Sequence, residues 1–391
     1  MTKESLEVSH LKHRLKIFDM LYISAMGLGT SVESVEGARV RPVVHVTESF
    51  GGGVAAAIRD YSRNYPAAEH HLVYAPRKDA PIEASDVSEF ASVTRLPQGH
   101  LRRITELRRL LRGHSEAVVH AHSSFAGVYV RAAVAKSHQR PIVYTPHCYG
   151  FERRDTGIAQ RSVFWALEWL FAFNTTAFAA CSQREEELSN WPLTSAKAVH
   201  VPNVVSSDIP VTDVHVPSGR IMHVVGAGRL GPQKDPLFFR DCVVALRNAG
   251  HEIAATWIGG GDTDTELMLA SAGVETTGWL TRQGVLESFK SADVYIHSAR
   301  WEGFPIAVLE ASTMGVPIVA RDISAFVGVN IPLLISSPAD LVEAWPGLQS
   351  ASVRRDMVRS ASLALEHCND AEQARALRDL YDSRIPVASQ V

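Results

Sequence analysis

The fold is decided by the stretch WEGFPIAVLEA, residues 301–311. It follows a β-branched and aromatic run at residues 293–297, which predicts a short buried strand. Pro305 suits the first position of a helix and Gly315 its end, and residues 316–320 restart a strand. The segment therefore predicts a unit of strand, loop, helix and strand.

The two glutamates of this stretch differ in setting. Glu302 lies on the loop at the carboxyl end of a strand, where parallel sheets bind their ligands. Glu310 lies inside the helix among apolar neighbours. Two interpretations are open. Either Glu310 lies on a solvated helix face, or it accepts hydrogen bonds from ribose hydroxyls while Glu302 and the following amides contact a sugar and a phosphate.

Composition narrows the classes of function. A chain of 391 residues has room for two domains, each with its own core. The net charge of −3 gives no argument for nucleic-acid binding, and no aromatic-rich basic module is present. The four cysteines are far apart and lack metal-ligand spacing, which favours reduced thiols in a cytoplasm.

Residues 1–40 form a predicted leader. Basic side chains precede the apolar run 17–23, as in a signal peptide, but Asp19 interrupts the run and no small-residue cleavage site follows. We therefore expect a poorly ordered extension. No run in the chain approaches the ~20 apolar residues of a membrane-spanning helix, so we expect any membrane contact to be peripheral.

From Arg41 the chain alternates strands and helices. Residues 42–46 predict the first buried strand, and a turn with three glycines follows it. Gly52 and Gly53 in this turn let backbone amides come close to a ligand, although a plain tight turn is equally compatible. Further strands are predicted at residues 71–74, 117–122, 141–147, 177–182 and 199–203.

Two of these strands end in histidine, His122 and His147. They lie at the edge where a doubly wound sheet binds its ligands. A single histidine there is more often structural, whereas two from separate strands favour at least one side chain that faces a cleft. His147, which precedes Cys148 and Tyr149, is the stronger candidate.

Two helices of the first half have unusual surfaces. Residues 101–112 carry five arginines beside leucines at helical spacing, which is typical of a helix on anionic lipid or of an ordinary solvated helix. Residues 161–173 are rich in Phe and Trp. That composition favours a buried or inter-domain helix over a contact with a membrane surface.

The second half repeats the alternation of strands and helices. The Pro-containing residues 206–219 predict a linker between an N-terminal domain, residues 41–205, and a C-terminal domain, residues 220–391. Two successive α/β sheets imply a cleft between domains, and the last helix can pack back on the N-terminal domain. The elements expected are strands at residues 221–225, 252–258 and 274–280, a helix at 283–291, and a helical tail at 353–381.

The loop GAGRLG at residues 226–231 matches the dinucleotide fingerprint. The next helix, however, starts late, beyond Pro232, and the following strand ends without an acid for a ribose. We interpret the match as accidental, so a dehydrogenase is not expected. Arg229 and Lys234 instead offer the cations that a diphosphate needs, most of all when it departs.

Asp262 and Asp264 follow a glycine-rich turn at residues 259–261. Their oxygens would suit Mg²⁺ or Mn²⁺, but no clear third carboxylate accompanies them. Helix capping is the favoured interpretation, and we expect no metal ion.

The second half resembles the retaining glycosyltransferases of family 4 in five elements that appear in order. Glu302 and Glu310 match the family's pair of glutamates separated by seven residues. The first half resembles the family more loosely, through residues 51–53 and His147. The matching segments of the second half are residues 228–230 with 234–236, 259–262, 278–280, 292–294, and 298–311 with 315–317.

This resemblance implies a GT-B architecture, an α/β fold in which two Rossmann-like domains face each other across a cleft. It also implies transfer with retained anomeric configuration and without a metal ion, the departing phosphate taking the acceptor's proton. The implied contacts are Arg229 and Lys234 to the donor diphosphate, Glu310 to the ribose, Glu302, Gly303 and Phe304 to the sugar and phosphate, His147 to the sugar near its reacting carbon, and the Leu280 backbone to the base.

Two features depart from the family pattern. Where the family has a glycine-rich turn and an acid, this chain has RDISAF at residues 321–326, so the edge of the donor pocket is left undefined. The leader before Arg41 has no counterpart in the family.

The sequence therefore predicts a cytoplasmic sugar transferase, at the inner face of the plasma membrane, that uses a nucleoside-diphosphate sugar and no cofactor. Because residues 47–54 look like those of bacterial surface-polysaccharide enzymes, the expected acceptor is a glycan or a lipid-linked precursor. Uridine diphosphate is favoured over guanosine diphosphate on frequency alone. Two rivals remain, a sugar-nucleotide epimerase of the same architecture and a non-catalytic sugar-nucleotide-binding subunit.

Overall fold

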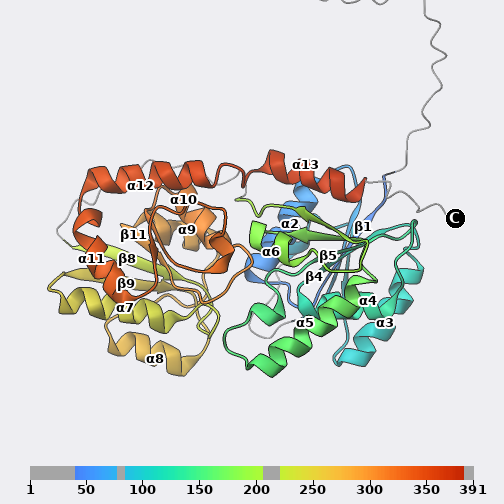
Figure 1. The fold of residues 1–391 in the computed structure, drawn as a ribbon, viewed down its shortest axis with the longest axis horizontal. Coiled ribbons are helices and arrows are strands. Elements are labelled where there is room, and N and C mark those ends of the chain that lie inside the picture. The colour runs from blue at the N-terminus through green and yellow to red at the C-terminus, as the bar shows by residue number, and fades with distance from the viewer. Residues whose placement is uncertain (1–39, 77–83, 206–220, 383–391) are drawn as a thin grey trace, which may run out of the picture. The chain divides into compact units, whose positions relative to one another are not determined.

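The computed structural model describes residues 40–76, 84–205 and 221–382, which build two parallel α/β sheets (Figure 1). The predicted fold class is thereby confirmed. The predicted leader up to residue 39 and the predicted linker at residues 206–219 lie outside the described residues. The boundaries of the two domains therefore stay a prediction.

The first sheet has seven parallel strands in the order β3-β2-β1-β4-β5-β6-β7. The first strand, β1, lies inside the sheet, and later strands are added on both sides of it. Because all strands are parallel, their carboxyl ends share one edge. The strands are β1 (Val43–Thr47), β2 (His70–Tyr74), β3 (Ser92–Arg95), β4 (Val118–His122), β5 (Ile142–Thr145), β6 (Ala177–Ala180) and β7 (Lys197–His200).

The second sheet has six parallel strands in the order β10-β9-β8-β11-β12-β13. The predicted unit around residues 301–311 forms its centre, as β11, a loop, a helix and β12. The strands are β8 (Met222–Ala227), β9 (Ile253–Ile258), β10 (Glu275–Thr276), β11 (Val294–His297), β12 (Ile318–Arg321) and β13 (Leu334–Ile335).

Helices cover both faces of the first sheet, because successive strand residues point to opposite faces. Val44 and Val46 of β1 lie in a core with one layer of helices, and Val43 lies in a core with the other layer. The first layer is α3 (His100–Arg112), α4 (Ser124–Ala133) and α5 (Ile158–Ala172), and the second is α2 (Gly52–Asn64) with α13 (Asp370–Tyr381). The short α6 (Gln183–Leu188) follows β6.

The second sheet is covered in the same way. One core joins Trp257 of β9 to Phe239 and Trp345 of the neighbouring helices. The other joins Tyr295 of β11 to Phe289 and Leu309. The helices are α7 (Pro236–Asn248), α8 (Thr263–Ser271) and α11 (Pro338–Leu348) in the first core, and α9 (Arg282–Lys290), α10 (Ile306–Thr313) and α12 (Ala351–Ala364) around the second.

Aspartates cap two helices at the carboxyl edge of the second sheet. The Asp235 side chain accepts a hydrogen bond from the amide of Phe238 at the start of α7. The Asp262 carboxylate accepts one from the amide of Thr265, 2.9 Å away, at the start of α8. The capping interpretation of Asp262 is therefore confirmed.

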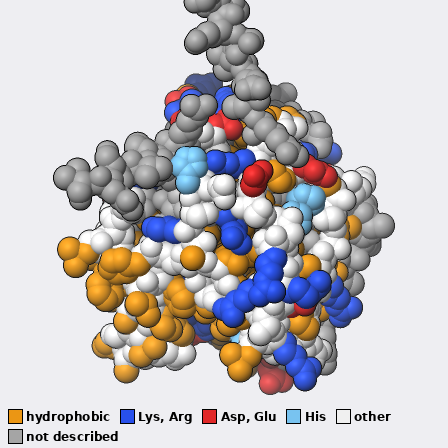
Figure 2. Space-filling model, turned by 90° about the vertical axis from the view of Figure 1, so that its right-hand side faces the viewer, with side chains coloured by type: hydrophobic (Ala, Val, Ile, Leu, Met, Phe, Trp, Pro, Cys, Tyr) orange, Lys and Arg blue, Asp and Glu red, His pale blue; other side chains and the backbone are white. Residues whose placement is uncertain are grey.

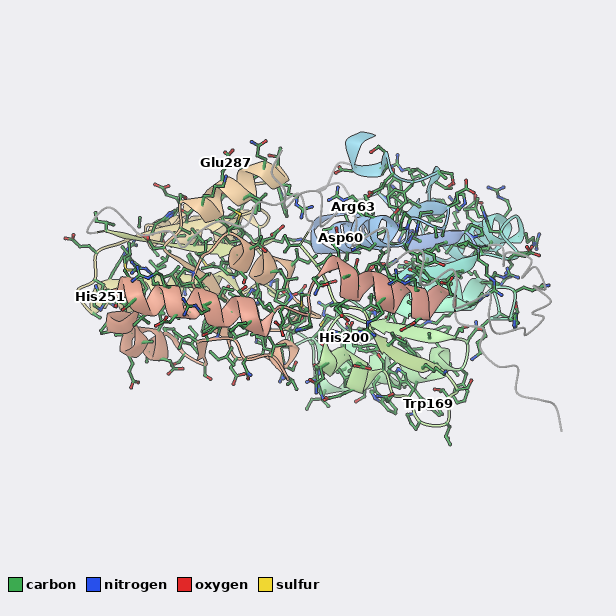
Figure 3. All side chains as sticks on the ribbon, turned by 90° about the horizontal axis from the view of Figure 1, so that it is seen from above. Asp60, Arg63, Trp169, His200, His251 and Glu287 are labelled. Carbon is green, nitrogen blue, oxygen red and sulfur yellow. The ribbon has the colours of Figure 1, made fainter. Side chains whose placement is uncertain are left out.

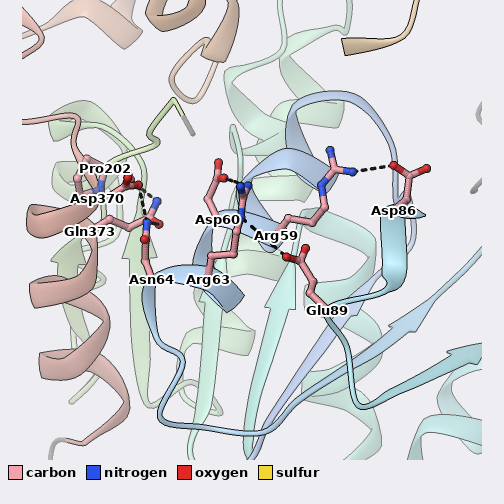
Figure 4. A network of polar contacts seen from close by, with 9 residues as sticks. All are labelled: Arg59, Asp60, Arg63, Asn64, Asp86, Glu89, Pro202, Asp370 and Gln373. Carbon is pink, nitrogen blue, oxygen red and sulfur yellow. Dashed lines mark hydrogen bonds and ion pairs between the residues drawn. The ribbon is translucent and has the colours of Figure 1, made fainter. Parts of the chain in front are cut away.

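Helix α13 packs on α2 of the first sheet (Figure 4). The Asn64 side-chain amide donates to Asp370 Oδ1 at 2.9 Å and to Gln373 Oε1 at 2.7 Å. Gln373 in turn donates to the Pro202 carbonyl oxygen at 2.8 Å. The last helix therefore contributes to the core of the first sheet.

Helix α5 contradicts the sequence interpretation. Residues 161–173 were expected to be buried or to lie between domains, but only Glu168 and Ala172 of α5 are buried, while Trp165 is 45% and Leu170 59% exposed. On the inward face, Glu168 pairs with the buried Arg131 of α4 at 2.8 Å, and Phe164 and Trp169 pack partly buried against the core of the first sheet. Apolar composition alone therefore misled the prediction.

None of the helices in the described parts of the chain is long and apolar enough to cross a membrane.

Other elements were missed or misplaced. The edge strand β3 and helix α11 were not predicted. The helical tail is two helices, α12 and α13, and β7 begins at Lys197 rather than Val199. Pro305 is the N-cap of α10 rather than its first residue. Short edge strands and exposed helix ends give weak sequence patterns, which accounts for these errors.

Candidate functional site

Two loops at the carboxyl edge of the second sheet bring Lys234 and Glu302 together. The Lys234 Nζ atom lies 2.5 Å from Glu302 Oε1, and the side chain of Glu302 is only 9% exposed. Gln233 donates to Glu302 Oε2 at 3.3 Å, and Ser298 Oγ donates to the Lys234 carbonyl oxygen at 2.7 Å. The loop after β8 and the loop after β11 thus hold one ion pair in a fixed position.

Glycines let the neighbouring loops pack this closely. A Cβ atom on Gly228 would lie 2.8 Å from Lys234 Cγ, and one on Gly259 would lie 2.1 Å from the Gly228 carbonyl oxygen. Both glycines have positive φ angles, 137° and 132°. Gly226 instead lies inside β8, where a Cβ atom would meet the Trp257 ring at 2.7 Å. Gly226 and Gly228 of the apparent dinucleotide fingerprint therefore serve packing between loops and strands, whereas a Cβ atom on Gly231 would meet nothing within 4 Å.

Glu310 lies on α10, inside the unit that the sequence placed at the centre of the fold. Its burial raises the pKa of the carboxyl, and the charges of Arg282 and Lys234 act in the opposite direction. Among the described residues, its side chain has no hydrogen-bond or ion-pair partner. A mostly buried carboxylate without a protein donor is suited to accept hydrogen bonds from a ligand.

The His147 turn follows β5 in the first sheet and is held in an unusual conformation. His147 has a φ of 50° and Cys148 a φ of 87°, which non-glycine residues rarely adopt. The buried Glu185 carboxylate fixes the turn, since Oε1 accepts from the Cys148 amide at 2.7 Å and Oε2 from the Cys181 amide at 2.8 Å. Burial raises the pKa of Glu185.

Gly303 is the residue at which the loop after β11 of the second sheet packs against the His147 turn of the first sheet. A Cβ atom on Gly303 would lie 2.8 Å from Cys181 Sγ and 2.9 Å from the Cys148 amide nitrogen. The next residue, Phe304, accepts a hydrogen bond on its carbonyl oxygen from Asn203 at 2.8 Å. The loop that carries Glu302 therefore lies directly against the His147 turn.

The remaining predicted site residues are less closely joined. A Cβ atom on Gly53 would lie 3.7 Å from the Ile306 side chain at the start of α10, and Gly52 faces open space. Arg229 is exposed on the loop after β8. Leu280 is 39% exposed between β10 and α9. Phe304 is buried, and its ring lies 6.2 Å from that of Phe326.

A basic pocket of about 430 Å³ lies beside these loops. Arg154, Arg300 and Arg321 line it together with Asp322 and Ser324. Arg321 donates to Asp235 Oδ2 at 2.7 Å, so the pocket adjoins the residue that follows Lys234. It lies where the sequence departs from the family pattern, at residues 321–326.

Sequence reasoning found His122 and His147 but missed His45 and His70, which lie in the same buried group on the first sheet. The available signal was that β1, β2 and β4 each carry a histidine. Only the register between strands shows that these side chains meet, since His45 pairs with His120 across β1 and β4.

Comparison with known families gives a match on each sheet. Residues 222–348 match the family described as "Glycosyl transferases group 1". Residues 51–208 match "Glycosyltransferase Family 4". The two matches do not overlap.

Two curated relatives share about a quarter of their residues with the chain. An uncharacterized 41.2 kDa protein in the cps region of Klebsiella pneumoniae is 24% identical over 295 residues, covering 72% of this chain and 81% of that protein. The UDP-Gal:α-D-GlcNAc-diphosphoundecaprenol α-1,3-galactosyltransferase of Escherichia coli is 25% identical over 249 residues, covering 57% of this chain. That match spans 62% of the galactosyltransferase, less than two thirds of its length.

Two solved structures share the fold. The sucrose-phosphate synthase of Thermosynechococcus elongatus has a TM-score of 0.70 at 15% identity, covering 88% of this chain and 98% of that one. Anabaena Alr3699/HepE, in complex with UDP, has a TM-score of 0.65 at 14% identity, covering 87% and 99%. Because each sheet has its own family match and the fold is GT-B, the chain belongs to glycosyltransferase family 4 and is a glycosyltransferase.

Proposed function

We propose that this glycosyltransferase moves a hexosyl or related group from a UDP-sugar to a lipid-linked glycan of a bacterial surface polysaccharide, with retained configuration and without a metal ion. The observation that carries the proposal is the Lys234–Glu302 pair, whose loop lies against the His147 turn through Gly303. This arrangement brings a cation and a carboxylate of the second sheet next to the backbone of the His147 turn on the first sheet.

In the proposed reaction, the donor diphosphate lies beside Lys234 and Arg229. The bond between the anomeric carbon and the β-phosphate breaks as the acceptor oxygen attacks, and negative charge develops on the leaving diphosphate. Fixed cations stabilise that charge more in the transition state than in the ground state. Arg229 and Lys234 are the protein cations proposed for this neutralisation, and the proposed mechanism without a metal ion requires the diphosphate to share Lys234 with Glu302.

The other donor contacts follow from position and chemistry. Glu310 accepts hydrogen bonds from the ribose hydroxyls, since its buried carboxyl lacks a protein partner in the part of the chain that the structure describes. Glu302, Gly303 and Phe304 contact the sugar and its phosphate, and the Leu280 backbone lies near the base. The departing phosphate takes the proton of the acceptor hydroxyl.

The choice of UDP is supported by two relatives. The E. coli galactosyltransferase is named for UDP-Gal, and Anabaena Alr3699/HepE was solved with UDP. Both relatives share at most a quarter of their residues with this chain, so the donor base needs a direct test.

The acceptor proposal rests on the basic pocket and on one relative. Arg154, Arg300 and Arg321 offer three guanidinium groups, which pair well with phosphate oxygens. The E. coli relative is named for a diphosphoundecaprenol acceptor. A lipid-linked acceptor diphosphate in this pocket would lie beside the donor loops, because Arg321 contacts Asp235.

A lipid-linked acceptor requires the enzyme to reach the membrane, and two helices on one face of the first sheet suit this. Helix α5 exposes Ile158, Trp165 and Leu170, and helix α3 exposes Arg102, Arg109 and Arg112. Apolar and basic side chains gather next to each other on the face shown in Figure 2. An apolar helix near exposed arginines fits an anionic bilayer, which supports the proposed location at the inner face of the plasma membrane.

The test is a transfer assay with UDP-hexoses and a lipid-diphosphate-linked sugar in mixed micelles, with EDTA present. The proposal expects a product with the donor's anomeric configuration, and loss of transfer in Lys234→Ala. An inverted product, or transfer that EDTA abolishes, would contradict the mechanism. Consumption of the donor without acceptor, through epimerisation, would contradict the assignment as a transferase.

A further inference from the structure

Three buried histidines of the first sheet, His70, His45 and His122, and the partly buried His147 of the turn after β5 form a continuous chain of hydrogen bonds. His70 Nδ1 lies 2.9 Å from His45 Nε2, and His45 Nδ1 lies 3.0 Å from His122 Nε2. His122 Nδ1 lies 3.2 Å from His147 Nε2. At the far end, His70 Nε2 lies 2.8 Å from the carbonyl oxygen of Tyr65. This chain of hydrogen-bonded histidines, called the histidine chain below, therefore runs from the Tyr65 carbonyl to His147 at the candidate site.

The register of the parallel strands brings these rings together. His45 of β1 is paired with His120 of β4, and His122 follows two residues later on the same face. His70 of β2 is paired with Val43, two residues before His45. His45, His120 and His122 are completely buried, and His70 is 4% exposed. No solvent is needed to complete their hydrogen bonds.

One end of the chain determines the proton position on every ring. A carbonyl oxygen can only accept, so His70 must donate from Nε2 to Tyr65. A neutral imidazole has one donor and one acceptor nitrogen, so His70 Nδ1 accepts from His45 Nε2. By the same step, His122 Nε2 donates to His45 and His147 Nε2 donates to His122.

This order requires neutral rings, and the surroundings favour them. Burial lowers the pKa of His45, His122 and His70, and neighbouring histidines lower these pKa values further. Burial also lowers the pKa of His147 to about 4. At neutral pH each ring therefore carries a single proton.

The histidine chain fixes the orientation and protonation of its imidazole rings and does not conduct protons. A relay needs a base at its far end, and the Tyr65 carbonyl cannot take up a proton. The consequence lies at the other end. His147 is left with its proton on Nε2 and a lone pair on Nδ1, and among the described residues this Nδ1 atom has no hydrogen-bond partner.

We propose that His70, His45 and His122 are positioning residues that fix His147 as the Nε2–H tautomer, so that its Nδ1 atom accepts a hydrogen bond from a hydroxyl of the transferred sugar. This inference rests on the proposed function for the identity of the ligand, but not for the tautomer. It explains why a doubly wound sheet keeps polar rings in its core, at strand positions that usually hold Val or Ile.

Two histidines of this hydrogen-bonded chain, His45 and His122, lie close to a further buried histidine, His120, in an arrangement that could form a metal site. Nitrogens of His45, His120 and His122 lie within 4.8 Å of one another. These rings, however, already use their nitrogens, and His120 lies 2.7 Å from both Tyr381 Oη and Thr145 Oγ1. Binding a metal would break several of these hydrogen bonds, so the structure favours the hydrogen-bonded chain.

The experiment reads the tautomers directly, by ¹⁵N NMR of the full chain with ¹⁵N-labelled histidine, assigning His147 by the signal lost in His147→Gln. The wild type is expected to show His147 protonated on Nε2 alone. His70→Phe removes the fixed end, so His147 should become a mixture of tautomers. His70→Gln restores a donor for Tyr65 and an acceptor for His45, and should keep the order.

The matched control is His71→Phe. His71 is the next residue on β2, but its ring contacts Ser92 Oγ at 2.8 Å outside the chain. It should leave the His147 tautomer and the activity unchanged. His70→Phe should lower kcat/KM for the UDP-sugar by roughly two- to tenfold, which corresponds to the loss of one hydrogen bond, and His70→Gln should restore most of it.

Each outcome is decisive, even if His70→Phe fails to fold, because the wild-type spectrum already tests the chain. A wild-type His147 protonated on Nδ1, or on both nitrogens, overturns the proposal. So does one equivalent of bound metal whose removal by EDTA shifts the ring signals. If the tautomer is as expected but no nucleotide sugar binds, the proposed function fails while the assigned chain stands.

Discussion

At the residue scale, the site depends on glycine positions, where a larger side chain would clash, as much as on its charged side chains. Gly303 is the clearest case, since a Cβ atom there would lie within 3.0 Å of the backbone of the His147 turn. The sequence identified Gly303 through the family resemblance, but the contact that requires glycine lies on the other sheet. No local pattern reveals such a contact.

Gly303→Ala is therefore expected to separate the Glu302 loop from the His147 turn. Overpacking of this kind costs about 1–3 kcal/mol of unfolding free energy. We expect kcat/KM to fall more than tenfold, because a displacement of about 1 Å can cost about a hundredfold in rate. Gly157→Ala is the control, since its Cβ atom would meet nothing within 4 Å. Equal activity of the two variants would refute the contact.

A second residue-scale prediction concerns Asp60 on α2, which lies beside Arg63 (Figures 3 and 4). Burial raises the pKa of Asp60 to about 7. The native state then binds more protons than the unfolded state between about pH 4 and 7, so stability falls as the pH rises through this window. The total loss is about 4 kcal/mol.

Asp60→Asn cannot titrate, so it should lack this pH dependence. Chemical unfolding at pH 4 and pH 8 measures the effect. The free energy of unfolding of Asp60→Asn minus that of the wild type should be larger at pH 8 than at pH 4. Parallel profiles would show instead that the contact with Arg63 keeps the carboxylate charged.

At the scale of elements, the sequence predicted the unit around residues 301–311 because its strand, loop and helix follow one another locally. The exposure of α5 could not be predicted in this way. A helix rich in Phe and Trp is apolar whether it faces a protein core or a lipid surface. Tertiary packing shows which side faces inward, namely Glu168 against Arg131, and Phe164 and Trp169 against the core. The histidine chain was missed for the related reason that strand register is not local.

Helices α3 and α5 are expected to bind anionic vesicles together. Leu170→Glu introduces a charge on the apolar face of α5, and Arg102→Glu reverses one on α3, which should weaken binding by about 2 kcal/mol. The control is Leu363→Glu on α12, a leucine that is 64% exposed. Sedimentation with phosphatidylglycerol vesicles measures the difference. If all three variants bind equally, the surface contacts something other than lipid.

At the scale of the whole molecule, the order of both sheets is that of doubly wound folds, and the sequence predicted this class from its alternation of strands and helices. The position of α13 was not fixed by that alternation. Leu377 is completely buried in a core with Tyr61 of α2, and Tyr381 reaches His120 at 2.7 Å. The last helix is therefore part of the core around the histidine chain.

Leu377→Ala should lower the unfolding free energy by about 2–5 kcal/mol, because it leaves a cavity in this core. Arg375→Ala, on the exposed side of the same helix, should change it by less than about 1 kcal/mol, since it removes only a surface ion pair with Glu372. Denaturant titration compares the two variants. A small effect of Leu377→Ala would mean that α13 can detach without cost.

The most direct test of the central claim is a thermal-shift titration of the full chain with UDP and UDP-sugars in the presence of EDTA. At one hundred times the dissociation constant, a ligand should add about 2.7 kcal/mol of stability. Lys234→Ala and Glu310→Gln should lose this gain, while Lys290→Ala, on α9, should keep it. If no nucleoside diphosphate stabilises the wild type, or only a nicotinamide dinucleotide does, then the site built around Lys234, Glu302 and Glu310 does not bind a sugar nucleotide.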